Sequence, residues 1–270
     1  MTMKILLLSL RNSSSANLEK ISEIKIDLMR IGHQVFEIKA DASMYQVLKS
    51  RKPDLVFNLA SVYDEEKANR IPAILEIAGV SYTGSGMLGL SFNRFYNQLF
   101  PLVSESGIDT MPFRTIKADE SGLLHDLTFP VTLFREGSCK KSLFGEASEI
   151  RKFLRTLPPH DEVILFNALK GKPISIFILN RIPFLTKDNH PCLEAASRIY
   201  DLIEARGLAR FDFIIHDGIL FASMDCAPDP LNLELNQDML ENGWNQTRLL
   251  TYMVETASSD LRHDGGMPHK

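Results

Sequence analysis

Two aspartates and one arginine near the end of the chain are the residues whose types and spacing could do chemistry. Arg210 and Asp212 lie two positions apart in an alternating Ala-Arg-Phe-Asp-Phe segment, so a strand would place both side chains on one face. Asp225 ends a second alternating segment, and Asp217-Gly218 between the two is typical of a hairpin turn. Two carboxylates suit a divalent metal ion, and a guanidinium suits a phosphorylated or oxyanionic intermediate. An ordinary ion pair on a surface hairpin is the alternative.

Strand and helix patterns alternate in the first third of the chain. Residues 4–10 form a short apolar run that predicts a buried strand, and residues 18–31 carry apolar residues at helical spacing. Residues 34–38 and 55–59 predict two further strands. This alternation indicates a parallel sheet with helices on both faces.

The rest of the chain predicts a mixture of helices and strands. Helices are expected over 90–106, 147–157, 192–206 and 244–256, and strands over 112–116, 129–134, 162–168 and 174–179. The two segments that contain Arg210 and Asp225 form the predicted hairpin over 209–225. The fold class is therefore α/β at the start of the chain and α+β in its C-terminal part.

Composition excludes several classes of function. With 44% hydrophobic and 24% charged residues, the 270-residue chain is typical of a globular protein, and its net charge of −4 argues against nucleic-acid binding. The sequence contains no run of 18 apolar residues, so we expect no transmembrane helix and no membrane partner. The three cysteines, Cys139, Cys192 and Cys226, have no metal-binding or redox spacing, which fits a reducing cytoplasm.

Several motifs occur in an order that resembles the ATP-grasp ligases of the D-alanine–D-alanine ligase type. They are Asp54–Asn58, Ile71–Gly79 and Tyr82–Gly86, then Phe129–Val131 with Arg135-Glu-Gly-Ser138, and finally the hairpin. The resemblance runs from about Lys4 to about Leu250 and implies the ATP-grasp fold. The expected organisation is an N-terminal Rossmann-like domain over 1–90, a central subdomain over 91–170, a C-terminal subdomain over 171–262, and a disordered tail over 263–270.

The resemblance also implies a reaction and roles for individual residues. In this family ATP phosphorylates a carboxylate, and an amine then attacks the acyl phosphate. Arg210 would stabilise the developing oxyanion, and Asp212 and Asp225 would hold Mg²⁺. Ser138 and the backbone N–H groups of its loop, including that of Gly137, would contact phosphate or substrate.

The chain departs from the family where ATP should bind. The family's Asp-Lys pair falls on Phe95-Tyr96, two further lysines fall on Phe100 and Phe134, an acidic residue falls on Phe166-Asn167, and a metal-binding asparagine falls on Ala227. Arg94 is close enough to substitute if two residues have slipped. Lys140 and Lys141 could restore positive charge near the phosphates, or they could be solvated surface residues.

The substrate side departs as well. The family's long tyrosine- and lysine-rich lid has no room here, because Pro183–Lys187 runs almost directly into the helix that begins at Cys192. The family's His-Gly and Gly-Glu signature is replaced by Ser61–Lys67. Asp64, Glu65 and Glu66 in this loop could bind an amine, or they could simply be solvated.

Two hypotheses of different classes follow. The first is a degenerate ATP-grasp protein, a pseudoenzyme with a binding, partner or regulatory role and weak or absent ATP and Mg²⁺ binding. The alternative is an active ATP-dependent carboxylate–amine ligase with atypical phosphate contacts. The resemblance implies an amino-acid or peptide-like ligand, and either a homodimer or a partnership with an active ligase. A third hypothesis is a plain α/β scaffold with a different pocket near Tyr63–Lys67.

Overall fold

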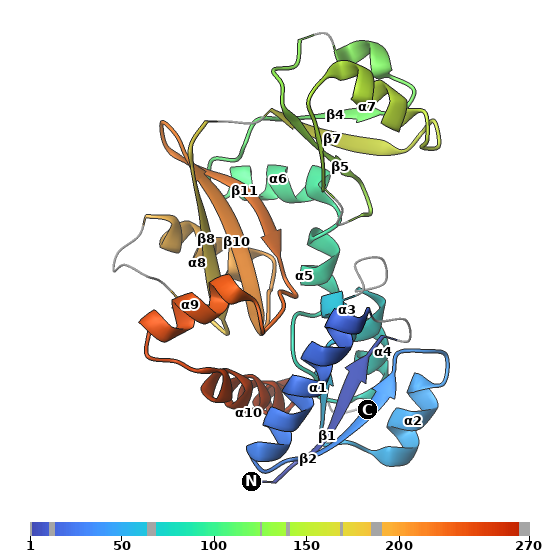
Figure 1. Cartoon of the computed structure of the whole chain (residues 1–270), viewed down its shortest axis with the longest axis vertical. Coiled ribbons are helices and arrows are strands. Elements are labelled where there is room, and N and C mark those ends of the chain that lie inside the picture. The colour runs from blue at the N-terminus through green and yellow to red at the C-terminus, as the bar shows by residue number, and fades with distance from the viewer. Residues whose placement is uncertain are drawn as a thin grey trace, which may run out of the picture. The chain divides into compact units, whose positions relative to one another are not determined.

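The computed structural model describes residues 2–10, 14–63, 69–124, 126–138, 141–167, 170–184 and 191–264. The described residues form a mixed α/β fold with one three-stranded and two four-stranded sheets (Figure 1). They divide into two compact units. Unit 1 comprises 1–90, 176–210 and 225–270, and unit 2 comprises 91–175 and 211–224. The predicted site residues Asp64, Glu65, Glu66 and Lys140, and tail residues 265–270, lie outside the described residues.

The parallel sheet of unit 1 confirms the predicted N-terminal strands. Strand β1 (Lys4–Ser9) lies between β2 (Gln34–Lys39) and β3 (Leu55–Asn58), and both pairings are parallel. Ile5 and Leu7 belong to the core on one face, and Leu6 and Leu8 belong to the core on the other. A strand buried on both faces has no polar positions, which is why this segment reads as a continuous apolar run.

Helices cover both faces of that sheet. The first core includes residues of α1 (Ser15–Arg30), α9 (Leu233–Glu241) and α10 (Gln246–Asp264), and the second includes residues of α2 (Met44–Arg51) and α4 (Arg70–Ala78). The short α3 (Ala60–Tyr63) follows β3 in the chain, and α8 (Cys192–Leu202) precedes the strand that begins at Leu208. No helix in the described ranges is both long and apolar enough to cross a membrane.

Unit 2 contains an antiparallel sheet. Its strand order is β4 (Phe113–Lys117), β7 (Glu162–Asn167), β5 (Val131–Arg135) and β6 (Lys141–Phe144). Helix α7 (Ala147–Leu154) and the 3₁₀ turn η1 (Ser121–Leu124) contribute to the aliphatic core on one face. The pairing Phe134↔Lys141 fixes the register of β5 on β6, and Phe134↔Ile164 fixes β5 on β7.

The predicted hairpin is confirmed as part of the third sheet. Its strand order is β11 (Ile219–Asp225), β10 (Leu208–Ile215), β8 (Lys172–Leu179) and β9 (Ile182–Phe184). Along β10, buried residues alternate with partly buried ones, so Arg210 and Asp212 share a face of this strand as predicted. The periodicity of the sequence did not predict α2, α9, β6 or β9.

Three predicted helices have wrong boundaries. The helix expected over 244–256 runs from Gln246 to Asp264. The helix expected over 90–106 is two helices, α5 (Met87–Phe92) and α6 (Tyr96–Glu105), because Phe95 has φ −120° and ψ 70° and ends the helical path. The helix expected over 192–206 ends at Leu202, and Glu204 takes a left-handed φ of 51°. Such a backbone angle is incompatible with a continuing α-helix.

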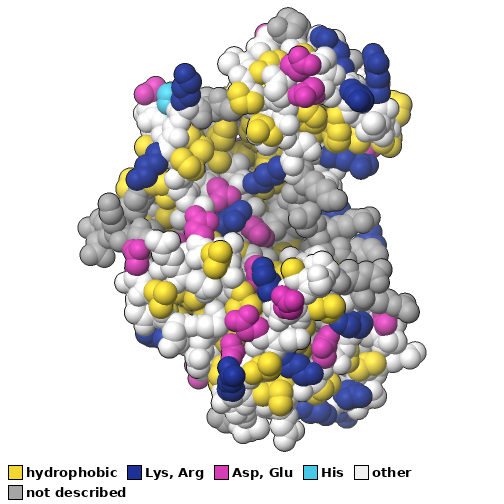
Figure 2. All heavy atoms as spheres, in the orientation of Figure 1, with side chains coloured by type: hydrophobic (Ala, Val, Ile, Leu, Met, Phe, Trp, Pro, Cys, Tyr) yellow, Lys and Arg dark blue, Asp and Glu magenta, His cyan; other side chains and the backbone are white. Residues whose placement is uncertain are grey.

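Charged side chains of both signs are interspersed over the face drawn in Figure 2. This distribution agrees with the small net charge of −4. Nucleic-acid binding would require a broad basic patch, and the described residues show no broad patch of one sign on this face.

Candidate functional site

Asp212 on β10, the first predicted metal ligand, is held by two serine hydroxyls. Ser175 Oγ donates to Asp212 Oδ1 at 2.9 Å, and Ser223 Oγ donates to Asp212 Oδ2 at 2.6 Å. Lys141 Nζ donates in turn to Ser223 Oγ at 2.7 Å. All four residues belong to unit 2, and we call them the Asp212 cluster. Both carboxylate oxygens of Asp212 thus accept hydrogen bonds from the protein itself.

The second predicted metal ligand is also engaged within its own unit. Asp225 Oδ1 accepts a hydrogen bond from the backbone N–H of Ala227 at 2.9 Å, and Ala227 itself offers no side-chain donor atom to a metal. Among the described residues, no group of three or more His, Cys, Asp or Glu side chains could hold a metal ion. Mg²⁺ bound by only one or two carboxylates depends on substrate phosphates for further ligands. Whether Mg²⁺ fits therefore depends on whether a triphosphate fits.

Buried aromatic rings occupy the positions at which the resemblance predicts charged contacts to ATP. The centroids of Tyr96 and Phe134 are 4.5 Å apart, those of Tyr96 and Phe100 are 5.5 Å apart, and Phe166 lies 5.0 Å from Phe100 and 5.1 Å from Phe134. These four residues are at most 3% exposed. They come from α6, β5 and β7, so the fold brings together four positions that the sequence separates by up to 70 residues.

The ring cluster extends to the hairpin within unit 2. Phe221 of β11 lies 5.6 Å from Phe100 and 5.9 Å from Phe213, and Phe113 stacks on Phe100 at 5.1 Å. We use the term ring cluster for Tyr96, Phe100, Phe113, Phe134, Phe166, Phe213 and Phe221. Pairs of rings in such geometry add about 0.5–1.5 kcal/mol each to the gain from burial. The rings are therefore a hydrophobic core, and their buried members have almost no surface left to border a triphosphate.

Lys141 is positioned by the register of β5 on β6. Phe134 and Lys141 are directly paired, so their side chains lie on the same face of the sheet. Lys141 Nζ lies 5.2 Å from the centre of the Phe134 ring, within the range of a cation–π interaction. Lys141 is exposed overall, yet its ammonium has a protein partner in Ser223.

Arg94 and Gly137, both predicted to bind cofactor, bind each other. Arg94 Nε donates to the carbonyl oxygen of Gly137 at 2.7 Å, a second guanidinium nitrogen donates to the same oxygen, and Gly137 N–H donates to Arg94 O at 2.8 Å. Gly137 has φ 76°, a left-handed angle that favours glycine. Ser138 N–H donates to Arg135 O at 3.0 Å. These bonds fasten the Glu-Gly-Ser loop to the segment between α5 and α6.

Glu136 supplies the cap for helix α6 that the helix's own sequence lacks. Phe95 at the N-cap position has no capping side chain, and Glu136 Oε1 accepts the backbone N–H of Asn97 at 2.8 Å. Asn97 Nδ2 also donates to Glu162 at 3.0 Å. Burial, and to a smaller extent the nearby Glu162, raise the pKa of Glu136 to about 7, although hydrogen bonds from the backbone N–H groups of the helix oppose the shift. The sequence contained no signal for this cap, because the acceptor lies 39 residues from its donor.

Replacing Glu136 by glutamine is expected to stabilise the protein at pH 8 and to have a smaller effect at pH 5. The Glu136 carboxyl has its ordinary pKa of 4.5 in the unfolded protein and a pKa of about 7 in the folded protein. Its contribution to the free energy of unfolding therefore falls as the pH rises between these two values. Glutamine keeps an oxygen acceptor for the Asn97 N–H but carries no charge. Glu136 is only partly buried, so solvent screening limits the gain to the order of 1 kcal/mol. Melting temperatures at both pH values measure it.

Glu105→Gln is the control, since it removes one carboxylate from an exposed position on α6, the helix that Glu136 caps. An equal effect of Glu136→Gln at the two pH values would show that burial of this carboxyl does not contribute to the pH dependence of stability.

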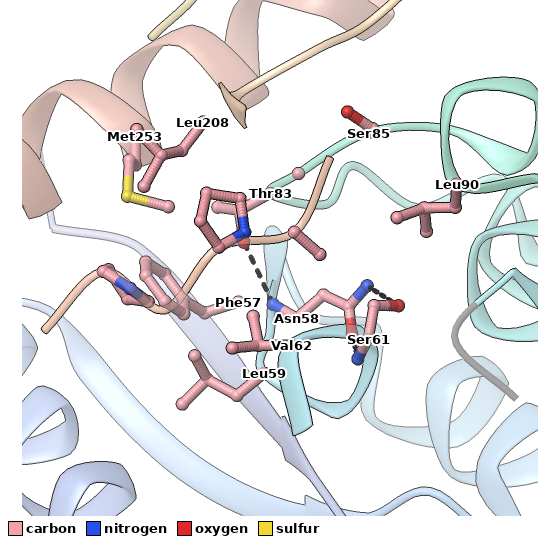
Figure 3. Close-up of a pocket in the computed structure, with 14 residues that line it drawn as sticks. Phe57, Asn58, Leu59, Ser61, Val62, Thr83, Ser85, Leu90, Leu208 and Met253 are labelled. Carbon is pink, nitrogen blue, oxygen red and sulfur yellow. Dashed lines mark hydrogen bonds between the residues drawn. The ribbon is translucent and has the colours of Figure 1, made fainter. Parts of the chain in front are cut away.

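A pocket lies at the carboxyl end of β3, wholly within unit 1 (Figure 3). Asn58 N–H donates to Thr83 Oγ1 at 3.0 Å, Asn58 Nδ2 donates to Ser61 Oγ at 2.8 Å, and Ser61 N–H donates back to Asn58 Oδ1 at 3.2 Å. The described lining carries no charged side chain, and its free space holds about one water molecule. The pocket in this state is too small for an amino acid.

Tyr63, the first residue of the loop proposed for the third hypothesis, is engaged in unit 1. Its hydroxyl donates to Asp229 Oδ1 at 3.3 Å, and Lys20 Nζ binds Asp229 Oδ2 at 2.5 Å. Burial raises the pKa of the Tyr63 hydroxyl, and the Asp229 carboxylate raises it further. These contacts connect α1, α3 and the segment after β11. The next residues, 64–68, lie outside the described ranges.

Comparison with known proteins places these observations in a family context. The chain is 26% identical to the D-alanine–D-alanine ligase of Pelagibacter ubique (strain HTCC1062) over 191 residues, which is 67% of this chain and 62% of that enzyme. It is 24% identical to the D-alanine–D-alanine ligase of Rickettsia bellii (strain RML369-C) over 229 residues, 71% of this chain and 70% of that enzyme. The chain thus spans less than two thirds of the Pelagibacter enzyme. No family model matches it.

The fold comparison covers the chain almost completely. The crystal structure of D-alanine–D-alanine ligase from Bacillus anthracis complexed with ATP matches 98% of this chain and 100% of that one, with a TM-score of 0.79 at 18% sequence identity. This match confirms the predicted fold class.

Proposed function

We propose, from the premise that the chain is a D-alanine–D-alanine ligase-like protein with the ATP-grasp fold, that it has a binding, partner or regulatory role and does not turn over ATP. The observation that carries this proposal is the ring cluster. Tyr96, Phe100 and Phe134 stand where the resemblance predicts lysines, and each is at most 3% exposed.

The energetic reason is the charge of the nucleotide. The phosphates of ATP carry three to four negative charges, which need cations or backbone N–H groups close by. At 4 Å, and at an effective dielectric constant of about 20, one lost cation removes about 4 kcal/mol of attraction before desolvation is counted. The loss of three lysines therefore exceeds what a few new backbone contacts could replace.

The loop that would contact the phosphates supports the same proposal. The N–H of Gly137 already donates to Arg94 O, and the Arg94 guanidinium already binds Gly137 O. A phosphate would have to compete with these protein bonds for the same groups. We propose that Arg94 and Gly137 are structural residues and that Ser138 has no catalytic role.

The ligand, partner and location of such a protein follow from the family and are proposals of the same kind. A small amino-acid or peptide-like molecule is the ligand class, and either a second copy of the chain or an active ligase is the protein partner. The cytoplasm is the proposed compartment, because its reducing conditions suit the buried thiols of Cys192 and Cys226, which form no disulfide.

One observation favours the alternative, an active carboxylate–amine ligase. The Lys141 ammonium lies 5.2 Å from the ring centre of Phe134, so a cation is present near a position where the resemblance predicts one. Arg210 and Asp212 are also retained on one face of β10. In this alternative Arg210 would stabilise an oxyanion, Asp212 and Asp225 would hold Mg²⁺, and Lys141 would contact phosphate.

Thermal unfolding with millimolar Mg²⁺-ATP separates the two candidates. We expect no rise in the melting temperature of the wild-type protein, because an unbound nucleotide cannot stabilise the folded state. A ligand present at 100 times its dissociation constant would add about 2.7 kcal/mol, which is easily measured. A D-alanine–D-alanine ligase that binds ATP, run under the same conditions, provides the positive control.

The double variant Asp212→Asn with Asp225→Asn identifies the origin of any stabilisation. A rise with Mg²⁺-ATP that disappears in this variant would establish the ligase-like site and contradict the proposed function. A rise that persists would place the nucleotide elsewhere on the chain.

A further inference from the structure

We propose that the Lys141 ammonium is the resident counter-cation of Asp212 and replaces a divalent metal ion there. This inference rests on the proposed function, because an active ligase would need the metal. The fold family implies Mg²⁺ at this position, and the residues of the Asp212 cluster do not fit such an ion. The cluster supplies its own positive charge and lies entirely within unit 2.

The backbone register holds Lys141 in this place. Lys141 is the direct partner of Phe134 across β5 and β6, and its ammonium lies 5.2 Å from the Phe134 ring centre. Phe134 is itself 3% exposed and fixed by Tyr96 and Phe166. The ring therefore limits the conformations of the lysine stem and directs the ammonium toward Ser223.

The direction of the hydrogen bonds orders the cluster. An ammonium only donates, and a carboxylate only accepts. Ser223 Oγ has one proton, which it donates to Asp212 at 2.6 Å, so its lone pair is available to accept from Lys141 at 2.7 Å. Ser223 is 4% exposed, so this hydroxyl connects a cation to an anion where little water competes.

A divalent ion at Asp212 would meet two obstacles. Each carboxylate oxygen of Asp212 already accepts a hydroxyl proton, from Ser175 or from Ser223, so the ion would have to compete with these hydrogen bonds for the oxygen lone pairs. It would also lie near the Lys141 ammonium, and like charges repel strongly in a partly buried site. Mg²⁺ gives up its water ligands reluctantly, so a site that resists on both counts remains unmetallated.

The test measures Mn²⁺ binding without nucleotide, by the loss of the free-ion signal in electron paramagnetic resonance. We expect no saturable Mn²⁺ site that depends on Asp212 in the wild-type protein. Lys141→Met removes the charge and keeps an apolar stem over Phe134, and should bind Mn²⁺ at least about tenfold more tightly than any residual binding of the wild-type protein. Lys117→Met is the matched control, since it removes one charge from an exposed lysine of the same sheet.

Stability supplies a second readout in the absence of metal. Lys141→Met should lower the melting temperature by about 2–4 °C, because Asp212 loses its counter-cation. Adding Asp212→Asn should recover part of that loss, since the neutral amide needs no cation. Ser223→Ala should cost at least as much as Lys141→Met, because it breaks both hydrogen bonds at once.

Either of two results would overturn the inference. The first is a wild-type Mn²⁺ site that Asp212→Asn abolishes. The second is Lys141→Met binding Mn²⁺ no better than Lys117→Met and showing no coupling to Asp212→Asn. Neither result depends on ATP, so stabilisation of the wild-type protein by Mg²⁺-ATP would contradict the proposed function without deciding what balances Asp212.

Discussion

Restoring a lysine at Phe134 is expected to destabilise the protein by about 3–5 kcal/mol and to leave its response to Mg²⁺-ATP unchanged. The Phe134 ring is 3% exposed and contacts Tyr96 and Phe166 at 4.5 and 5.1 Å. A lysine at this position loses both ring contacts and places an ammonium within the ring cluster. The Lys141 ammonium, already close by, would repel it. Urea unfolding measures the loss, and thermal unfolding with Mg²⁺-ATP measures the response to nucleotide.

Phe134→Met separates the charge from the loss of the ring. Methionine is apolar and flexible enough to fill most of the space, so its cost should be nearer to about 1 kcal/mol. A Phe134→Lys protein as stable as Phe134→Met, and stabilised by Mg²⁺-ATP, would contradict the proposed function. It would mean that the ring replaced a phosphate ligand without closing the site.

Gly171→Ala is expected to destabilise the protein by about 2–3 kcal/mol. A Cβ atom at Gly171 would lie 2.5 Å from Ile214 Cγ2 and 2.6 Å from the carbonyl oxygen of Ile215, both closer than atoms can approach. The isoleucine side chain can rotate away, but the Ile215 carbonyl belongs to strand β10 and moves only if the strand moves. Chemical denaturation of the variant and the wild-type protein measures the difference.

Gly218→Ala is the matched control for Gly171→Ala. Gly218 lies just before β11, and a Cβ atom built there has no neighbour within 4 Å. The same change in size should therefore cost little. If the two variants are equally stable, the close approach at Gly171 is relieved by a backbone adjustment that costs almost nothing.

Strands β1 and β3 of the parallel sheet could be predicted because burial on both faces leaves an apolar run in the sequence. Residues 5–8 are apolar without interruption, and the structure divides them between two cores. The hairpin was equally readable, since the alternation around Arg210 and the Asp217-Gly218 pair are local signals. Both predictions rest on residues that are close in sequence.

The elements that were predicted wrongly or missed depend on contacts with residues distant in the sequence. The break between α5 and α6 coincides with contacts from Glu136 and Gly137, some forty residues later. Strand β6 has four residues and none of them is fully buried, so its sequence gives only a weak strand signal. The substitutions at Tyr96, Phe100, Phe134 and Phe166 were visible one by one. Their assembly into a single core required the fold.

Among the candidate site residues, the sequence could identify types but not partners. Arg94 and Lys141 were recognised as cations close to the segments that would bind phosphate. Arginine and lysine can bind either a ligand or other protein groups, and in the structure both residues bind protein groups. Ser175 and Ser223 carried no signal, because a serine in a strand is common and only the sheet brings both to Asp212.

The pairing of Phe134 with Lys141 bears on how diverged relatives are compared. A comparison by sequence column finds an aromatic residue where a basic one is expected, and concludes that the charge has vanished. In three dimensions the neighbouring strand returns a basic group to within 5.2 Å of the same ring. The electrostatic potential at a site depends on the charges near it in space, and a residue on any neighbouring strand can provide such a charge. When a distant homologue lacks a motif residue, the residues on the neighbouring strands should therefore be examined before the function of that residue is considered lost.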